Sequence, residues 1–108
     1  MFLCGRDINF SYSKEPILTD FSFSIEEAMI AAIIGPNGSG KTTLLKIING
    51  ILFPANGSLL INGVDSRRWP RKELAKTVAI VPQENFSIFP FYAEEIVLMG
   101  RFPHLKNH

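Results

Sequence analysis

The sequence predicts a small α/β domain that combines an antiparallel sheet with a strand, loop and helix unit. Three observations predict this fold class: apolar and polar side chains alternate before residue 26, residues 29–34 are apolar without alternation, and a glycine-rich loop at 35–40 precedes a helical pattern. Alternation is typical of strands with one wet face, whereas an unbroken apolar run is typical of a strand buried on both faces. A chain of 108 residues has room for one such domain and not for two.

Two strands are expected before residue 26. Apolar residues share one face in each of them: Ile8, Phe10 and Tyr12 in the first, and Phe21, Phe23 and Ile25 in the second. The run 13–16, Ser-Lys-Glu-Pro, has turn-forming residues and is expected to connect them. These segments predict an antiparallel sheet.

The later elements are predicted from short apolar runs and the stop signals beside them. Residues 29–34 and 78–81 are expected to be buried strands, and residues 59–61 a strand that turns back at Asn62-Gly63. Residues 41–49 are expected to form a helix that ends at Asn49-Gly50, with Leu44, Leu45 and Ile48 as its apolar face. Further helices are expected at 69–76, with a proline in the first turn, and at 93–99.

The composition excludes several classes of protein. Hydrophobic residues make up 46% of the chain and charged residues 19%, as in a globular protein. Eleven Lys and Arg stand against ten Asp and Glu, which provides no electrostatic argument for a nucleic-acid partner. The one cysteine, Cys4, excludes an internal disulfide framework and is expected to be a buried thiol without a role. Without a signal peptide or an apolar stretch of roughly 18 residues, the chain is expected to be cytosolic.

One motif carries chemistry. The residues Gly35-Pro36-Asn37-Gly38-Ser39-Gly40-Lys41-Thr42 fit the phosphate-loop pattern GxxxxGK[ST]. Glycines at 35, 38 and 40 are expected to take positive φ, so that successive amides point inward at phosphate oxygens. The helix that follows adds its free amides and the positive end of its dipole.

Three side chains complete this site. Lys41 is expected to bridge the β and γ phosphates of a nucleoside triphosphate, the Thr42 hydroxyl to ligate Mg²⁺, and Thr43 to donate toward the α phosphate. A flexible loop that binds nothing is the alternative, but the buried strand before the motif and the helix after it both favour the phosphate loop.

The flanks of the loop resemble the nucleotide-binding subunit of ABC transporters. The resemblance covers nearly the whole chain: Asn9-Phe10-Ser11-Tyr12 and Pro16-Ile17-Leu18 resemble that family's opening strands, and the loop, continued to Thr43, is similar to its usual GPNGSGKTT. Gly50, Pro54, Gly57, Ile61-Asn62-Gly63 and Asp65 resemble the hairpin segment that follows, and Val81-Pro82-Gln83-Glu84 resembles the Q-loop.

The resemblance implies a phosphate-loop NTPase fold with ATP and Mg²⁺ as cofactors. It implies that Tyr12 stacks on adenine and that Gln83 senses Mg²⁺ and the γ phosphate. It also implies transmembrane permease subunits and a second copy of the ATP-binding subunit as partners, with the protein peripheral on the cytoplasmic face of the membrane. The tail at 97–104 is similar to importers of iron chelates, haem and cobalamin.

The sequence departs from the family pattern in three places. Ala28-Met29 replaces the usual Gly-Glu pair in the turn before the loop strand, and Tyr92 replaces the usual Thr or Ser before the last helix. The third departure is the absence of later motifs.

The signature loop, the catalytic glutamate and the switch histidine have no counterpart in 1–108. The chain therefore looks like the N-terminal part of an ABC transporter ATP-binding domain, truncated after the Q-loop. We therefore expect ATP binding without hydrolysis by this chain alone. A non-functional truncated product without a stable fold, or another phosphate-loop enzyme such as a small nucleotide kinase, remain alternatives.

Other candidate residues have simpler interpretations. The basic run at 67–72 is expected to be a solvated helix start. His104 and His108 have no partners at metal-ligand spacing and are expected to lie on the surface. The aromatic cluster after the Q-loop is a candidate docking surface for a membrane subunit; it comprises Phe86, Phe89, Phe91 and Tyr92.

Overall fold

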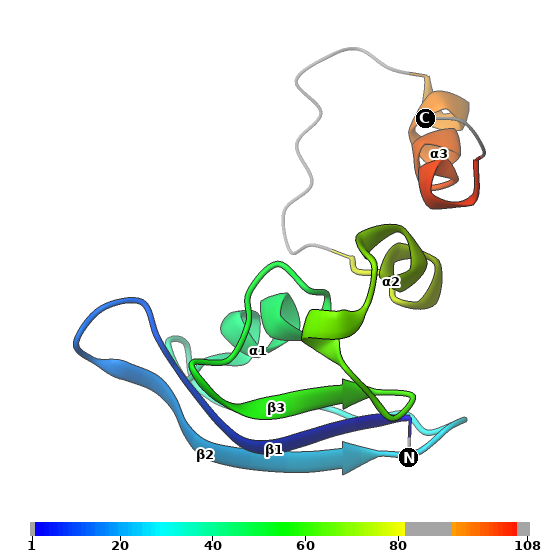
Figure 1. Ribbon diagram of the computed structural model, residues 1–108. Coiled ribbons are helices and arrows are strands. Elements are labelled where there is room, and N and C mark those ends of the chain that lie inside the picture. The colour runs from blue at the N-terminus through cyan, green and yellow to red at the C-terminus, as the bar shows by residue number, and fades with distance from the viewer. Residues whose placement is uncertain (1, 82–91, 106–108) are drawn as a thin grey trace. The chain divides into compact units, whose positions relative to one another are not determined.

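The computed structural model describes residues 2–81 and 92–105 (Figure 1). The chain forms two compact units, Met1–Trp69 and Pro70–His108. The first unit contains a sheet of β1 (Leu3–Ser11), β2 (Pro16–Ile25), β3 (Asn56–Ile61) and β4 (Val64–Asp65), in the order β2-β1-β3-β4. Each pair of neighbours is antiparallel. The predicted antiparallel sheet is therefore confirmed.

The central strand β1 pairs with β2 on one edge and with β3 on the other (Figure 1). Its register to β2 shifts between Ile8 and Phe10 and again between Phe10 and Ser11. Such an irregularity bends the strand and breaks strict alternation. As a result the expected common face of β1 is only partly formed: Ile8 is fully buried, Phe10 is half-buried, and Tyr12 lies beyond the strand and is 59% exposed.

The β3–β4 hairpin turns where the sequence predicts. Asn62 and Gly63 have φ values of 50° and 78°, the two positive values that a tight primed turn requires. A 3₁₀ turn, η1 (Ser66–Arg68), follows β4, and Asp65 caps it by accepting from the Arg67 backbone N–H at 2.9 Å. The Trp69 indole Nε1–H then donates to the Ile61 carbonyl at 3.1 Å, which attaches the end of this unit to the sheet.

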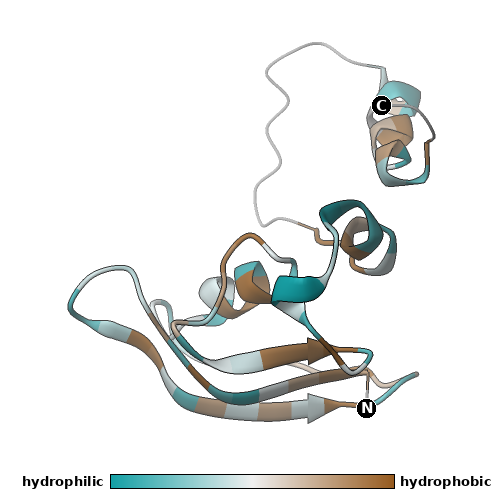
Figure 2. Cartoon of the chain, in the orientation of Figure 1, coloured by the Kyte–Doolittle hydropathy of each residue, from teal (hydrophilic) through white to brown (hydrophobic). Residues whose placement is uncertain are grey.

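The core of the first unit combines sheet residues with one helix. The apolar end of β3 is brown in Figure 2, and the side chains with no exposure include Ile8, Leu59, Ile61 and Ile47. Cys4 is buried as expected. Helix α1 (Lys41–Ile48) contributes Ile47 and ends at the predicted place, with Asn49 as its C-cap.

The predicted apolar face of α1 was wrong at one position. Leu44 is buried, but Leu45 is 42% exposed and Ile48 is half-buried. The buried stripe consists of Thr43, Leu44 and Ile47, which follow the i, i+1, i+4 spacing of one helix face. The predicted residues Leu44, Leu45 and Ile48 have the same spacing as the buried ones but lie one position later in the sequence.

The two predicted buried strands are not strands in this structure. Residues 29–34 have no regular secondary structure, and Ile30 and Ile34 are 100% and 93% exposed. Residues 78–81 are also irregular, and Val81 is 94% exposed. A strand requires a hydrogen-bonded neighbour. Within residues 2–81 and 92–105, the sheet contains only β1 to β4 and offers these runs no such neighbour.

The second unit contains short helices. These are α2 (Arg71–Thr77), α3 (Ala93–Met99) and the 3₁₀ turn η2 (Phe102–His104). Both predicted helices are confirmed, although Pro70 is the N-cap of α2 rather than part of its first turn. Tyr92 is the N-cap of α3 and makes no side-chain capping bond, in keeping with its poor capping chemistry.

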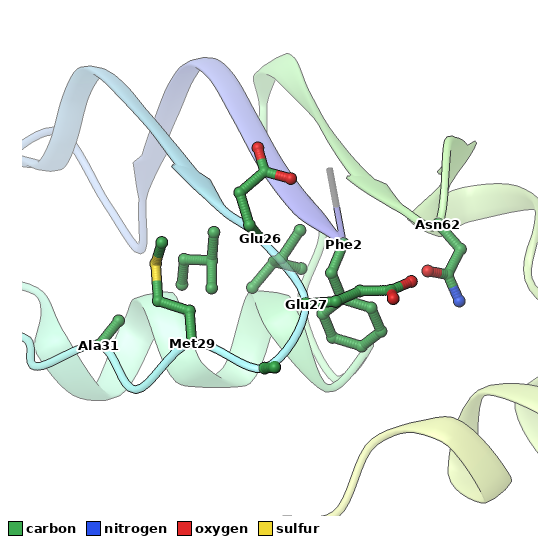
Figure 3. A pocket seen from close by; sticks show the side chains of 9 residues that line it. Phe2, Glu26, Glu27, Met29, Ala31 and Asn62 are labelled. Carbon is green, nitrogen blue, oxygen red and sulfur yellow. The ribbon is translucent and has the colours of Figure 1, made fainter.

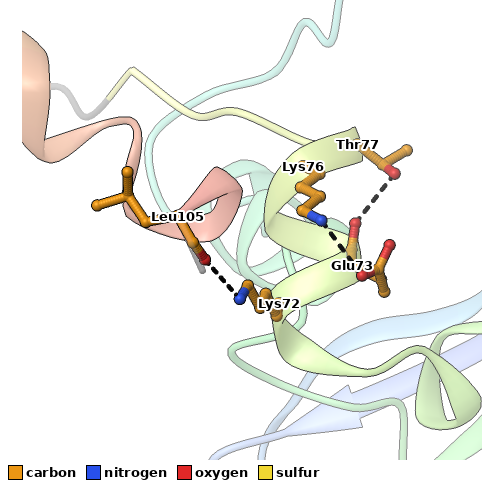
Figure 4. Close-up of polar contacts among 5 residues, drawn as sticks. All are labelled: Lys72, Glu73, Lys76, Thr77 and Leu105. Carbon is orange, nitrogen blue, oxygen red and sulfur yellow. Dashed lines mark hydrogen bonds and ion pairs between the residues drawn. The ribbon is translucent and has the colours of Figure 1, made fainter. Parts of the chain in front are cut away.

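Polar contacts of α2 are shown in Figure 4. The Lys72 ammonium donates to the Leu105 carbonyl beyond η2 at 2.7 Å. Within the helix, Lys76 pairs with Glu73 at 3.5 Å, and the Thr77 hydroxyl donates to the Glu73 carbonyl at 3.1 Å. Among the helices that the structure describes, none is both long and apolar enough to cross a membrane.

Candidate functional site

The phosphate-loop motif forms a bent connection that leads into α1. The Ser39 backbone N–H donates to the Pro36 carbonyl at 3.2 Å, which closes a turn inside the loop. Gly38 and Gly40 have φ values of 83° and 99°, as predicted. Gly35 does not have a positive φ, so that prediction was wrong. A Cβ at Gly35 would lie 2.6 Å from the Ser39 hydroxyl oxygen, so a larger residue there would require the Ser39 side chain to move.

Strand β2 supports the end of the loop. A Cβ at Gly40 would lie 2.9 Å from the Leu18 Cδ2 atom and 3.3 Å from the Ile17 carbonyl oxygen. Gly40 is therefore packed directly against the start of β2, and a side chain at this position would push the loop away from the sheet. Ile17 and Leu18 were not predicted to support the loop, although both lie in the segment 16–18 that resembles the family's opening strands.

The N-terminal end of α1 faces the loop with unused donors. The first helical hydrogen bond runs from the Leu44 N–H to the Gly40 carbonyl at 2.9 Å. Helix geometry leaves the amides before Leu44 without intrahelical acceptors, and the dipole makes this end positive. The first turn of α1 contains no acidic side chain that would compete for these donors. The arrangement suits an anion.

Lys41 reaches back across the loop. Its Nζ donates to the carbonyl of Gly35, six residues earlier. An ammonium group has three donors, so Lys41 can keep this contact and still donate to a bound anion. The Lys41 ammonium is the only charged group of residues 35–43, and this contact keeps it next to the loop.

Tyr12 lies beside the first turn of α1. Its hydroxyl is 3.2 Å from the Thr43 Oγ1 atom, although the two residues are 31 positions apart. The Phe10 ring contacts Tyr12 edge to face, with the ring centroids 4.9 Å apart and an interplanar angle of 84°. Tyr12 is 59% exposed, whereas Thr43 is 6% exposed. The ring of Tyr12 thus remains accessible for stacking while its hydroxyl is engaged.

The remaining predicted residues are distributed as follows. Thr42 is exposed in the first turn of α1, and Pro36, Asn37 and Ser39 are exposed in the loop. Gln83 lies outside the described residues, as do Phe86, Phe89, Phe91 and His108. In the described part of the chain, no group of three or more His, Cys, Asp or Glu residues could hold a metal ion. The structure therefore brings the loop, Lys41, Thr43 and Tyr12 together.

Two pockets lie away from this site. One, of about 490 Å³, has Phe2 and Asn62 on one side and Met29 and Ala31 on the other (Figure 3). A second, of about 350 Å³, lies between the apolar side chains of β2, residues 31–34, and α1. No residue of 35–43 lines either pocket. Both are bordered by the apolar run 29–34, which forms no strand.

The chain is similar to known proteins over most of its length. The sequence model of the family described as ABC transporter matches residues 18–101. The hemin import ATP-binding protein HmuV of Vibrio cholerae is 38% identical over 99 residues, which cover 92% of this chain and 38% of that protein. The chain thus spans about two fifths of the length of such relatives.

Solved structures show the same fold. A structure described as the ATP binding subunit of an ABC transporter has a TM-score of 0.83 and 25% identity, and covers 99% of this chain and 44% of its own. A bacterial Atm1-family ABC exporter with ATP bound has a TM-score of 0.71 and 30% identity, over 75% of this chain and 14% of its own. The loop geometry, the family match and the shared fold together show that the chain belongs to the ABC transporter family, among its ATP-binding subunits.

Proposed function

We propose that the chain binds Mg²⁺-ATP through residues 35–43, as part of the ATP-binding domain of an ABC transporter. One observation carries the proposal: two glycines in left-handed conformation lead into α1 while Lys41 lies across the loop. That arrangement gathers backbone donors and one cation around a space suited to phosphates. The family assignment favours this function over that of a small nucleotide kinase.

Each site residue has a distinct role in the proposal. Lys41 and the loop amides hold the β and γ phosphates, Thr43 donates toward the α phosphate, and Tyr12 stacks on adenine. Thr42 presents an exposed hydroxyl at the first turn of α1, a donor that fits Mg²⁺, which takes few protein ligands and several waters or phosphate oxygens. Gln83 is proposed as a second contact to the ion from the sequence resemblance alone. The ion would neutralise phosphate charge.

The transported substrate and the partners are also proposals. The relatives named as hemin import proteins support an importer of haem or a similar iron chelate or cobalamin. An ABC transporter of this kind needs permease subunits in the membrane and a second ATP-binding subunit. The protein would then act at the cytoplasmic face of the membrane, bound to the permease.

Titration with a fluorescent ATP analogue in the presence of Mg²⁺ tests the nucleotide site. Lys41→Ala should weaken binding by about 1.5–3 kcal/mol, because it removes a charge-assisted contact to the phosphates. Lys46→Ala is the matched control, since Lys46 lies in the last turn of the same helix and should leave the affinity unchanged.

Circular dichroism of the three proteins shows whether they are equally folded. Equal affinity of wild type and Lys41→Ala for the analogue would refute the phosphate-loop assignment.

A further inference from the structure

The contact between Tyr12 and Thr43 is not explained by adenine stacking. Stacking requires only the face of an aromatic ring, and a phenylalanine would supply it. Yet the hydroxyl of Tyr12 lies 3.2 Å from Thr43 Oγ1, in the first turn of α1. One hydrogen bond therefore connects Tyr12, the residue proposed to stack on adenine, to Thr43 in the first turn of α1, 31 positions later in the sequence.

Either hydroxyl could be the donor in this contact, and the relative acidity of the two groups favours one direction. Each hydroxyl has one proton to donate and lone pairs to accept with. A phenol is a stronger acid than an aliphatic alcohol, so the Tyr12 hydroxyl is the better donor and the Thr43 oxygen the better acceptor. In that direction the proton of Thr43 is left free for another acceptor.

The surroundings of Thr43 make this direction useful. A helical threonine can turn its hydroxyl back onto a carbonyl of the preceding turn, which would consume its proton locally. The Tyr12 contact instead occupies an acceptor position of Thr43 Oγ1.

We propose that Tyr12 is a positioning residue for phosphate binding, whose hydroxyl orients Thr43 so that Thr43 donates to a bound phosphate. The inference rests on the proposed function, because it assumes phosphates at residues 35–43. It adds that Tyr12 acts on the phosphate end of the ligand as well as on the base. The chain of hydroxyls, Tyr12 to Thr43 to phosphate, is also cooperative, since each hydrogen bond polarises the next.

The test separates the two ends of the ligand. Tyr12→Phe keeps the ring and removes the hydroxyl, and its binding to Mg²⁺-tripolyphosphate and to adenosine is measured by calorimetry. Tripolyphosphate has no base to stack, so its affinity reports the phosphate end alone. We expect Tyr12→Phe to lower tripolyphosphate affinity by about fivefold, the effect of one hydrogen bond, and to leave adenosine affinity unchanged.

Four further variants sharpen the result. Tyr92→Phe is the matched control, because Tyr92 is the other tyrosine of the chain and is 73% exposed in the second unit. Thr43→Val should also lower tripolyphosphate affinity, and Tyr12→Phe should add nothing to it in the double variant. Thr43→Ser keeps the hydroxyl and should bind nearly as wild type.

Each other outcome overturns the inference in a recognisable way. If Tyr12→Phe binds tripolyphosphate as wild type does, while Lys41→Ala does not, the positioning role is wrong and the proposed function stands. Equal losses of tripolyphosphate and adenosine affinity would show that Tyr12 only supports the fold. If wild type binds neither tripolyphosphate nor ATP, both the inference and the proposed function fail.

Discussion

Ala28 has a backbone φ of 59°, a conformation that glycine adopts more easily than alanine. The turn before residues 29–34 therefore has a left-handed residue at position 28, where the family resemblance leads one to expect glycine and this chain has a Cβ. Because an L-residue pays roughly 1 kcal/mol or more for this conformation, Ala28→Gly should raise the free energy of unfolding by about 1 kcal/mol. Urea denaturation followed by circular dichroism measures the change.

Ala31→Gly serves as the control for this substitution. Ala31 has no positive φ, so a glycine there should only add freedom to the unfolded chain and lower stability slightly. Equal effects of the two substitutions would contradict the strain at Ala28.

The loop residues were predictable because phosphate chemistry dictates both their types and their spacing. The predictions failed where one residue type serves two purposes. Gly35 was expected to supply a positive φ, but it does not have one, and its hydrogen side chain lies next to the Ser39 hydroxyl. The Tyr12–Thr43 hydrogen bond could not be predicted from local patterns, since it joins residues 31 positions apart.

At the scale of the elements, α1 shows which helix face carries the packing. Ile47 is fully buried and Leu45 is 42% exposed. Ile47→Ala should lower the free energy of unfolding by about 2–5 kcal/mol, because it removes buried methyl groups and leaves a cavity. Thermal or urea unfolding of the variant measures this loss.

Leu45→Ala on the same helix is the comparison. Since much of Leu45 already contacts water, its truncation should cost less than about 1 kcal/mol. A larger loss at Leu45 than at Ile47 would mean that the apolar face predicted from the sequence was the correct one.

Elements that depend on their own residues were predicted well, and so was the antiparallel sheet of β1, β2 and β3, but two further runs that would each need a strand partner were not. The helices at 41–48 and 93–99 and the hairpin turn at Asn62-Gly63 need only local hydrogen bonds and local capping or turn chemistry. The runs at 29–34 and 78–81 have the composition of buried strands but lack a pairing partner within the described residues. Apolar composition indicates that a segment tends toward burial, and not that a partner strand is present.

For the whole molecule, exposed isoleucines in the run 29–34 should promote association of the chain with itself. Ile30 is 100% exposed and Ile34 is 93% exposed. An extended segment with exposed apolar side chains and unpaired backbone groups tends to associate with another chain. Wild type should therefore sediment as a concentration-dependent mixture, and Ile30→Lys should shift it toward monomer. Analytical ultracentrifugation measures the shift.

Ile51→Lys is the control, because Ile51 is 59% exposed but lies outside the run. Its sedimentation should match that of wild type. A wild-type chain that sediments as a single monomer at all concentrations would rule out this association.

The chain of 108 residues should bind ATP without turning it over. Phosphoryl transfer needs a group that orients the attacking water and a field that stabilises the transferred charge. Tyr12, Lys41, Thr42 and Thr43 include no carboxylate to orient water, and contacts made equally to bound ATP and to the transition state do not accelerate the reaction. Phosphate release by purified chain should remain below about 1 s⁻¹, the low end of common enzyme rates.

Lys41→Ala identifies any contaminating ATPase in that assay. Release faster than this limit that disappears in Lys41→Ala would reveal a catalytic base elsewhere in the chain.

The hydrogen bond from Trp69 to Ile61 has a practical consequence for spectroscopy. Trp69 is the only tryptophan of the chain, and its indole N–H is held at 3.1 Å from a carbonyl of β3 at the end of the first unit. Loss of the sheet would expose the half-buried ring to water and change its emission. Trp69 is therefore an intrinsic fluorophore for the unit that contains the phosphate loop, and its signal follows unfolding of the sheet without a chemical label.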